Sequence, residues 1–284
     1  MAACSPSGST RAPAAPTTSG TGAGSSTPVT PPSATSPTSP PAPSTTVSAG
    51  PADIAARATV PVLCYHQLRD WTSKDGEYAR NLLICPPANF RTHLDALAEG
   101  GWSTITPDQY LQHLTTGSPL PAQPVMLTFD DGSEGQVTEG LVQLQRRQMN
   151  GTFFVMTVVL DKPNWMSSKN VRALADAGMT VGDHTWDHHR VDRYGAGDWE
   201  VQLEQSRQTL QQASGEPVEH FAYPYGAWNV EAIPHLQAAG YKTAYQLSDK
   251  PLDPSQPLYT LRRTLVRSTW SGPQLLAHLA GGTA

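Results

Sequence analysis

The sequence predicts an α/β fold in which parallel strands and helices alternate and form an irregular barrel. From residue 59 onward, short apolar runs rich in β-branched residues alternate with segments of helical periodicity. About seven or eight strand–helix repeats result, a pattern typical of parallel strands wrapped by helices. The folded part, expected at residues 58–284, has roughly the size of one such barrel.

The predicted strands are short apolar runs, the first of which is VPVLCYH. The following ranges are predicted as strands: 60–66, 102–106, 124–129, 151–156, 179–184, 220–224, 241–247 and 259–266. No G-x-G-x-x-G sequence follows the first of them, so a dinucleotide site has no support. A barrel is therefore favoured over an open, doubly wound sheet.

Helix start and stop signals lie between these strands. Asn89 is expected to cap the first helix, which Gly100 and Gly101 end. Pro107 follows Thr106 and takes the first position of the second helix. The remaining predicted helices are 136–148, 169–178 after Ser168, 199–212, 231–240 and 273–280.

Residues 1–57 differ in composition and are predicted to be a disordered Pro/Ser/Thr-rich tether. The first 51 residues contain 11 Pro and 21 Ser or Thr, and Arg11 is their only charged residue. Without apolar periodicity, such a segment buries too little surface to offset the entropy lost on ordering.

Charge and hydropathy limit the expected partners. The formal net charge is −5, and residues 1–57 contribute +1 (Arg11 and Arg57 against Asp53), which leaves −6 for the rest. This charge and the lack of a Lys/Arg cluster argue against a nucleic acid partner. No run of 18 apolar residues occurs, so no transmembrane helix is predicted. A monomer is expected.

Cys4 follows small residues and precedes the tether, as at the start of a mature bacterial lipoprotein. The hydrophobic segment expected before such a cysteine is missing, so a lipid anchor at Cys4 and an incidental cysteine both stay open. Export is expected, as a cell-surface lipoprotein or a secreted protein. Cys64 and Cys85 fit one disulfide or two buried free thiols equally well.

The predicted strand 124–129 runs into the sequence LTFDDG, which holds two adjacent carboxylates. Because consecutive strand residues face opposite ways, Asp130 and Asp131 would normally diverge. Gly132 permits a sharp turn that brings both carboxylates into one pocket. Alone, this sequence is more typical of a turn or a helix cap.

Two further strand ends carry unusual residues. In HTWDH, a helical turn over residues 184–188 would place His184 and His188 close enough to share a metal ion, with His189 as a rival ligand. FAYPYGAW, at 221–228, is predicted to form a rigid turn whose backbone N–H groups and aromatic rings face the mouth of the barrel, although alone it is more typical of a loop packed through its aromatic residues.

Together, the three strand ends predict a hydrolytic metal site, because parallel barrels place their active sites at the carboxyl ends of strands. Two histidines and one carboxylate leave open positions on a metal, and a second carboxylate supplies a base. The same ligands describe a non-haem iron oxygenase, which the strand–helix alternation disfavours. No G-x-S-x-G sequence supports a serine hydrolase.

TFDDG, the spacing H-T-x-x-H and FAYPYG, in that order, resemble the motifs of the NodB-type polysaccharide deacetylases, carbohydrate esterase family 4. VPVLCYHQL resembles the branch whose first strand ends in Tyr-His, and the resemblance covers about residues 60–270. It implies a distorted (β/α)₇ barrel that removes N-acetyl groups from a polymer of N-acetylhexosamine, or O-acetyl groups from xylan. It also implies a divalent metal, most often Zn²⁺, with Co²⁺, Ni²⁺ or Mn²⁺ as alternatives.

The resemblance assigns roles to individual residues. Asp131, His184 and His188 match the metal ligands, and Asp130 matches the catalytic base. The Tyr225 backbone N–H matches the donor to the oxyanion. The implied reaction is attack of metal-activated water on the acetyl carbonyl while the base accepts a proton.

Two positions depart from the family pattern. Many members carry Arg in R-x-P-Y-G, where it steadies the base, and this chain has Ala222 there. Arg263 on the last strand is predicted to reach the same carboxylate instead, with Arg262 as the alternative. The usual late general acid has only His278 as a match, inside a predicted helix, so His66 is the alternative acid.

Asp183 and Asp187 flank the ligand histidines and are expected to orient them as hydrogen-bond acceptors. Trp186, Tyr194 and Trp228 are candidate sugar-stacking surfaces. The polymer stays open between chitin-like chains, poly-N-acetylglucosamine, peptidoglycan and acetylxylan, and export favours a cell-envelope or extracellular glycan. The alternative function is a glycan-binding surface protein that has lost catalysis on the same barrel.

Overall fold

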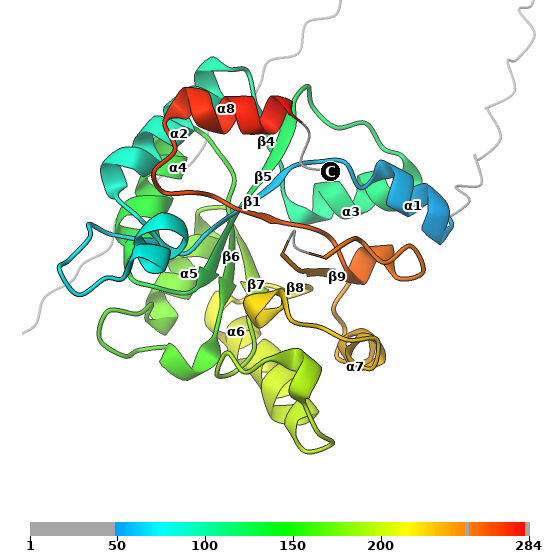
Figure 1. Cartoon of the computed structure of the whole chain (residues 1–284). Helices are drawn as coiled ribbons and strands as arrows, with labels where there is room; N and C mark the ends of the chain where they lie inside the picture. Colours follow the sequence, from blue (N-terminus) through cyan, green and yellow to red (C-terminus); the bar gives the residue numbers. More distant parts are fainter. Residues whose placement is uncertain (1–48, 248–249, 282–284) are drawn as a thin grey trace, which may run out of the picture. The chain divides into compact units, whose positions relative to one another are not determined.

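The computed structural model describes residues 49–247 and 250–281 (Figure 1). The strands are β1 (Val62–Tyr65), β2 (Gln67–Leu68), β3 (Ile84–Cys85), β4 (Ser103–Thr104), β5 (Pro124–Asp131), β6 (Thr152–Val155), β7 (Thr180–Asp183), β8 (His220–Ala222), β9 (Thr243–Tyr245) and β10 (Thr264–Leu265). The main sheet is parallel, with the order β10-β1-β5-β6-β7-β8-β9, and β4 pairs with β5.

The helices are α1 (Pro51–Arg57), α2 (Pro87–Glu99), α3 (Pro107–Thr116), α4 (Val142–Arg146), α5 (Ser168–Asp176), α6 (Ser206–Ser214), α7 (Ala232–Ala238) and α8 (Gly272–Ala280). Wider π-helical turns precede β3, α4 and α6, at Ala79–Leu83, Gln136–Leu141 and Glu200–Gln205. Figure 1 shows the strands at the centre with the helices around them, which confirms the predicted α/β fold.

The sheet closes on itself through a short bridge. The N–H of Leu261 donates to the carbonyl of Ala244, and the N–H of Gln246 donates to the carbonyl of Leu261. These bonds join the edge strand β9 to the segment that leads into β10. The result is an irregular barrel that is closed between β9 and this segment by a single β-bridge.

Strand alternation separates an interior core from a helix-facing core. Consecutive strand residues point to opposite faces, so Val62 and Phe154 lie inside the barrel while Leu63 and Phe153 lie under the helices. The interior cluster is small and consists mainly of Val62, Met126, Phe154, Ala222, Tyr245 and Leu261. All of these side chains are almost fully buried.

Helices α1 and α3 close one end of the barrel interior. Ile54 of α1 and Tyr110 and Leu114 of α3 belong to the interior cluster, and Arg57 donates a hydrogen bond of 3.0 Å to the Leu114 carbonyl. Residues 51–57 were predicted as tether, and that boundary is wrong because α1 buries Ile54 against the barrel. The tether prediction for residues 1–48 lies outside the described residues.

Two predicted helix starts are displaced. Helix α2 begins at Pro87, and Asn89 lies inside it and donates its side-chain amide to the Ser268 carbonyl at 2.7 Å. Helix α5 is capped by Ser167, whose hydroxyl accepts from the Asn170 N–H, one residue before the predicted start. The predicted start of α3 is confirmed.

The last predicted strand, 259–266, is shorter in the structure. A 3-10 turn at Pro257–Tyr259 precedes it, and regular pairing with β1 is limited to β10. Cys64 and Cys85 are both buried free thiols, so the alternative of a disulfide is wrong. Among the described residues, no helix has the length and apolar character needed to cross a bilayer.

Candidate active site

The carboxyl ends of the strands carry most of the predicted site residues. Asp130 and Asp131 end β5, His184 directly follows β7, and His66 directly follows β1. Tyr225 lies in the turn after β8. The site therefore forms at the end of the barrel where parallel strands present their functional groups.

Asp131, His184 and His188 converge on one point. Oδ1 of Asp131 lies 3.5 Å from Nε2 of His184 and 3.3 Å from Nε2 of His188. Zinc bonds of ~2.0–2.2 Å at tetrahedral angles separate neighbouring ligand atoms by ~3.3–3.6 Å. Within the described part of the chain, this buried Oδ1 has no hydrogen-bond partner. Both the spacing and the unpartnered oxygen fit a divalent cation, whereas the rival His189 is largely exposed and pairs with Asp187.

Left-handed backbone conformations, rather than a helical turn, build this cluster. Asp131 and Gly132 have φ values of 81° and 86°, which end β5 in a sharp turn. A Cβ at Gly132 would lie 2.8 Å from a β6 side chain, so glycine is required there. Thr185 and His188 have φ values of 69° and 67°. The predicted helical turn over 184–188 is therefore wrong, although the two rings still lie with centroids 4.9 Å apart.

A backbone carbonyl orients the first histidine ring. Nδ1 of His184 donates to the Ala222 carbonyl at 2.7 Å, which leaves Nε2 free to bind a metal. Asp183 points to the helix side of β7, and Asp187 accepts a hydrogen bond from the Gln202 side chain. The expectation that Asp183 and Asp187 orient the ligand histidines is therefore wrong for His184.

Asp130 is buried and bound on both oxygens. Nη1 and Nη2 of Arg263 donate to Oδ1 and Oδ2 at 2.6 and 2.8 Å, and the Cys64 thiol donates to Oδ2 at 3.5 Å. Burial raises the pKa of Asp130, but the charges of Arg263 and His184 outweigh it and hold this pKa well below its ordinary value. The carboxylate is therefore ionised at neutral pH.

His66 joins the site beside Asp130. Its Nδ1 lies 4.0 Å from Sγ of Cys64, and ligand atoms of Cys64, His66 and Asp130 lie within 4.8 Å of one another. A cation there would compete with the guanidinium of Arg263 for both oxygens of Asp130, so these three residues do not fit a second metal site. His278 lies in α8 as predicted, with its ring against a tryptophan.

Tyr225 lies over the metal-ligand cluster. Its φ is 60°, its side chain is 59% exposed, and its ring centroid lies 4.5 Å from that of His188. The following Gly226 also has a positive φ, and a Cβ there would lie 2.7 Å from the Leu247 nitrogen. The turn thus depends on glycine, and it brings the Tyr225 backbone to the mouth of the barrel.

One cavity adjoins the cluster, and a second is lined by residues that follow Asp131 in the chain. One, of about 440 Å³, is lined by His188, Tyr194 and Tyr225 together with charged residues of the loop after β7. The other, of about 710 Å³, is lined by Trp165 and by the residues that follow Asp131. Both have volumes typical of small-molecule sites and are large enough for a sugar ring.

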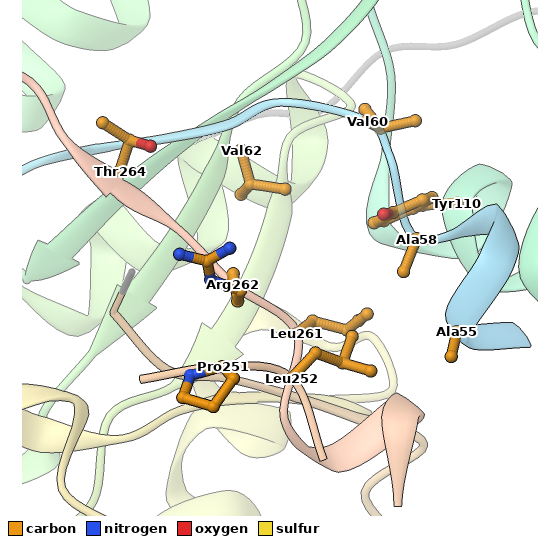
Figure 2. A pocket seen from close by; sticks show the side chains of 10 residues that line it. All are labelled: Ala55, Ala58, Val60, Val62, Tyr110, Pro251, Leu252, Leu261, Arg262 and Thr264. Carbon is orange, nitrogen blue, oxygen red and sulfur yellow. The ribbon is translucent and has the colours of Figure 1, made fainter. Parts of the chain in front are cut away.

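A third cavity, of about 160 Å³, lies near the start of β1, and most of the residues that line it have apolar side chains (Figure 2). Arg262 points into it, next to Val62 and Leu261. Because adjacent residues of an extended chain face opposite ways, Arg263 faces Asp130 instead. Arg263 rather than Arg262 is thus the arginine that reaches the buried carboxylate.

Sequence reasoning missed two residues of the site. Cys64 contacts Asp130, and strand alternation could have found it, because Cys64 and His66 share one face of the chain. Gln136 donates its side-chain amide to the carbonyls of Asp130 and His66, and nothing in its sequence context signals this. Among the stacking candidates, Trp186 is 41% exposed and Trp228 is packed with its Nε1 bound to a glutamine.

The chain is similar to known polysaccharide deacetylases. Residues 117–244 match the family model described as polysaccharide deacetylase. "Putative polysaccharide deacetylase YxkH" of Bacillus subtilis (strain 168) is 22% identical over 222 residues, which cover 78% of this chain and 76% of that protein. "Peptidoglycan-N-acetylglucosamine deacetylase" of Bacillus cereus is 25% identical over 154 residues, which cover 53% of this chain and 54% of that protein. The chain thus spans about half the length of this second relative.

The fold also matches solved structures. The Streptococcus pyogenes deacetylase PplD in complex with acetate superposes with a TM-score of 0.71 at 21% identity. The match covers 77% of this chain and 97% of that one. At this level of identity the likeness establishes the shared fold.

Proposed function

We propose that the chain is a polysaccharide deacetylase of the NodB type, which hydrolyses acetyl groups from an acetylated polysaccharide. The match of residues 117–244 to the polysaccharide deacetylase family model supports this proposal. The preferred substrate class is a polymer with N-acetylhexosamine units, such as a cell-envelope glycan, with O-acetylated xylan as the alternative. The observation that carries this proposal is the convergence of Asp131, His184 and His188 beside an ionised, buried Asp130.

The donor set favours a divalent metal. One carboxylate oxygen and two imidazole nitrogens suit Zn²⁺, and Co²⁺, Ni²⁺ and Mn²⁺ are the alternatives. When bound, such an ion supplies Lewis-acid chemistry, which lowers the pKa of water and polarises a carbonyl. Asp131, His184 and His188 would hold it through Oδ1 and the two Nε2 atoms.

Asp130 is proposed as the general base. Its low pKa keeps it ready to accept a proton at neutral pH, and Arg263 fixes the orientation of its carboxylate. A base of low pKa is intrinsically weak, so its contribution depends on its position next to the metal ligands. Oδ2 of Asp130 lies 3.8 Å from Nε2 of His184, which supports such a position.

Two groups on the other sides of the site complete the proposed mechanism. The Tyr225 N–H would donate to the oxyanion that forms when water adds to the acetyl carbonyl. His66 would carry a proton to the departing amine, because it is the histidine beside Asp130 and Cys64. Both roles follow from location at the mouth of the barrel.

We further propose that FAYPYG marks a branch in which Arg263 replaces the arginine of the third motif. The methyl group of Ala222 cannot bind a carboxylate, and Arg263 donates to both oxygens of Asp130, which supports this proposal. Export as a monomer, with a lipid anchor at Cys4 or as a secreted protein, stays a proposal from the sequence, since Cys4 lies outside the described residues.

The test is release of acetate from a panel of acetylated glycans by the full chain. We expect turnover by the metal-loaded protein, loss of turnover with chelator, and recovery on addition of Zn²⁺. Asp130→Asn should lower kcat about 10²–10⁴-fold while metal stays bound. His184→Ala should lose both metal and activity.

Equal acetate release by wild type and Asp130→Asn would contradict this mechanism. Glycan binding without acetate release from any substrate would favour the alternative of a catalytically impaired glycan-binding protein. Full turnover after complete removal of metal would contradict the assignment of Asp131, His184 and His188 as catalytic metal ligands.

A further inference from the structure

We propose that the cavity beside His188 is a subsite for a carboxylate on the glycan, so that the enzyme prefers acidic over neutral N-acetylated polymers. This inference rests on the proposed deacetylase function and names its substrate class. The cavity is the one of about 440 Å³ described above, and the inference concerns its basic residues Arg190 and Arg193.

The cavity is continuous with the proposed reaction centre. His188, a metal-ligand candidate, and Tyr225, the proposed oxyanion donor, both line it, and their ring centroids lie 4.5 Å apart. A polymer whose acetamido group reaches the centre must place a neighbouring substituent or sugar in adjoining space. The arginines on the cavity wall are therefore positioned to contact the substrate close to the scissile bond.

Positive charge collects around Asp192, on the short turn Val191–Arg193. Arg190 pairs with Asp192 at 2.7 Å, and Arg190, Arg193 and Lys250 all lower the pKa of Asp192. The cavity wall itself carries two arginines, Arg190 and Arg193, and one carboxylate, that of Asp198. Its arginines therefore outnumber its carboxylates, although the chain as a whole has a net charge of −5.

Two further polar residues of the cavity wall contact neighbouring groups of the same loop. Asp198 lines the cavity and accepts from the Gly195 N–H at 2.7 Å. His189 lines it as well and pairs with Asp187 at 3.2 Å. Arg193 is exposed, so its guanidinium is accessible to a ligand in the cavity.

A guanidinium binds a carboxylate through two parallel hydrogen bonds, whereas a neutral sugar offers it only hydroxyl groups. The shared chemistry of the ligand is therefore a carboxylate within about one sugar of the acetamido group. A lactyl ether or uronic acid on the sugar itself and a peptide attached to the sugar are its two possible sources. Among the candidate polymers named from the sequence, peptidoglycan carries carboxylates near its acetamido groups, and chitin-like chains do not.

The experiment compares kcat/KM for acetate release from two soluble substrates of equal length. One is a neutral N-acetylglucosamine tetramer, and the other is a tetramer in which alternate sugars carry a lactyl carboxylate, with and without an attached peptide. We expect wild type to prefer an acidic tetramer, and 0.5 M salt to reduce this preference. Arg193→Gln should lower the ratio of acidic to neutral kcat/KM about tenfold.

Arg146→Gln is the matched control, because Arg146 is an exposed arginine on the helix α4, outside the cavity. This control should leave the ratio of acidic to neutral kcat/KM unchanged. If only the tetramer with the attached peptide is preferred over the neutral one, the bound carboxylate belongs to the peptide. If the lactyl tetramer without peptide is also preferred, the bound carboxylate belongs to the sugar. A ratio near one in wild type, or equal ratios in wild type and Arg193→Gln, would overturn the inference.

Binding provides a readout that does not need turnover. In the Asp130→Asn background, the dissociation constant of the acidic tetramer should rise about tenfold when Arg193→Gln is added, and that of the neutral tetramer should rise less. If no variant or wild type releases acetate but this difference in binding appears, the deacetylase function fails and the carboxylate subsite stands. If acetate is released and the binding difference is absent, the subsite fails alone.

Discussion

Asp130 and Arg263 form a buried ion pair with two parallel hydrogen bonds at the base of the candidate site. Arg263 is 1% exposed, and its guanidinium also lies 5.3 Å from the centroid of the Phe154 ring. Each member of such a pair compensates the charge of the other, because a lone charge in this environment would lose its hydration without replacement. The pair therefore couples the stability of the barrel to the protonation state of the proposed base.

Arg263→Gln should destabilise the protein and raise the pKa of Asp130. Removing one member of a buried pair costs about 3–5 kcal/mol. The pKa of the remaining carboxylate rises because burial is then opposed by His184 and His66 without the guanidinium. We expect a lower midpoint of urea unfolding, and a pH–kcat profile whose acid limb moves to higher pH.

Arg263→Lys is the matched control for this prediction. It keeps the charge but donates from a single nitrogen, so its unfolding midpoint and acid limb should lie between those of wild type and Arg263→Gln. Identical acid limbs in all three proteins would show that Arg263 does not act on the proposed base.

Asp183 lies on the helix side of β7, and its pKa is raised, whereas the pKa of Asp130 is lowered. Burial raises the pKa of Asp183 from 3.8 to about 7, and it outweighs hydrogen bonds from Tyr241, Ser206 and the Thr185 N–H. The Tyr241 hydroxyl lies 2.5 Å from Oδ2 of Asp183 and 3.0 Å from the Leu203 carbonyl. A protonated Asp183 can donate to this hydroxyl while the hydroxyl donates to Leu203, so every group keeps a partner.

The raised pKa predicts a pH-dependent stability. Between about pH 4 and 7 the folded state holds a proton on Asp183 that the unfolded state has lost, so the free energy of unfolding falls as the pH rises through this window. Asp183→Asn places an amide donor toward Tyr241 and cannot titrate. Urea unfolding of metal-free protein should show wild type losing a few kcal/mol relative to Asp183→Asn between pH 4 and 8. Parallel stability curves for the two proteins would contradict the assignment.

At this scale, residue chemistry was easier to predict than local backbone geometry. The sequence indicated that the carboxylates of LTFDDG and the two histidines belong together, because strand ends of a parallel barrel meet at one edge. The choice of Asp131 as the ligand came from the resemblance to a family. It did not indicate the left-handed conformation of Thr185 and His188, since such values are uncommon for residues other than glycine. The Ala222 carbonyl that orients His184 was also beyond prediction, because a backbone acceptor leaves no mark in the sequence.

Helix α1 illustrates how tertiary packing determines a short element. It has seven residues and follows a segment rich in Pro, Ser and Thr, and a helix of this length is marginal in isolation. Its order comes from Ile54, which packs into the interior core beside α3, and from the bond between Arg57 and Leu114. A local pattern could not predict this, because the partner surface is supplied by a helix about 60 residues later.

Ile54→Ala should therefore destabilise the whole barrel, although Ile54 lies outside the predicted domain. Removing a buried isoleucine side chain costs about 2–4 kcal/mol. We expect a clear decrease in the midpoint of urea unfolding. Val230→Ala, a truncation at a 63% exposed residue, should change the free energy of unfolding by less than about 0.5 kcal/mol. Equal effects of the two substitutions would show that α1 does not close the barrel.

The strands were the elements that the sequence predicted best. Runs such as PVMLTF and GTFFVM are buried on both faces, so they read as continuous apolar segments bounded by polar residues. The last strand was predicted too long. Within the segment 259–266, only Thr264 and Leu265 pair with β1, and only Leu261 forms a bridge to β9. Sequence periodicity can indicate that a segment is extended, but it does not show whether a neighbouring strand pairs with it.

The two ends of the barrel differ in character: one end is filled by apolar side chains, and the other end carries the polar residues of the candidate site. Helices α1 and α3 cover the interior core at the end where Val62 begins β1, and the site residues lie at the other end. The mouth holds Asp130, Asp131 and two ligand histidines within a few ångströms of one another. The adjacent carboxylates of Asp130 and Asp131 repel each other. A bound cation would reduce this repulsion, so we expect it to stabilise this end of the barrel.

Binding of a divalent metal should therefore raise the stability of the whole chain, and it should do so through Asp131. A ligand that binds only the folded state stabilises it by about 2.7 kcal/mol at a concentration 100-fold above its Kd. Calorimetry of the chelator-treated protein should show an increase in Tm when Zn²⁺ is added. Asp131→Asn should lose most of this increase, because Oδ1 of Asp131 is the oxygen that faces both Nε2 atoms.

The neighbouring Asp130→Asn provides the matched control, since it makes the same chemical change one residue earlier. Asp130 is bound on both oxygens by Arg263, so the substitution should lower the starting Tm but leave the increase on addition of Zn²⁺ largely intact. The comparison therefore separates loss of a ligand from general damage to the mouth of the barrel. An equal increase in both variants, or none in wild type, would remove Asp131 from the metal site and leave the two histidines without their carboxylate partner.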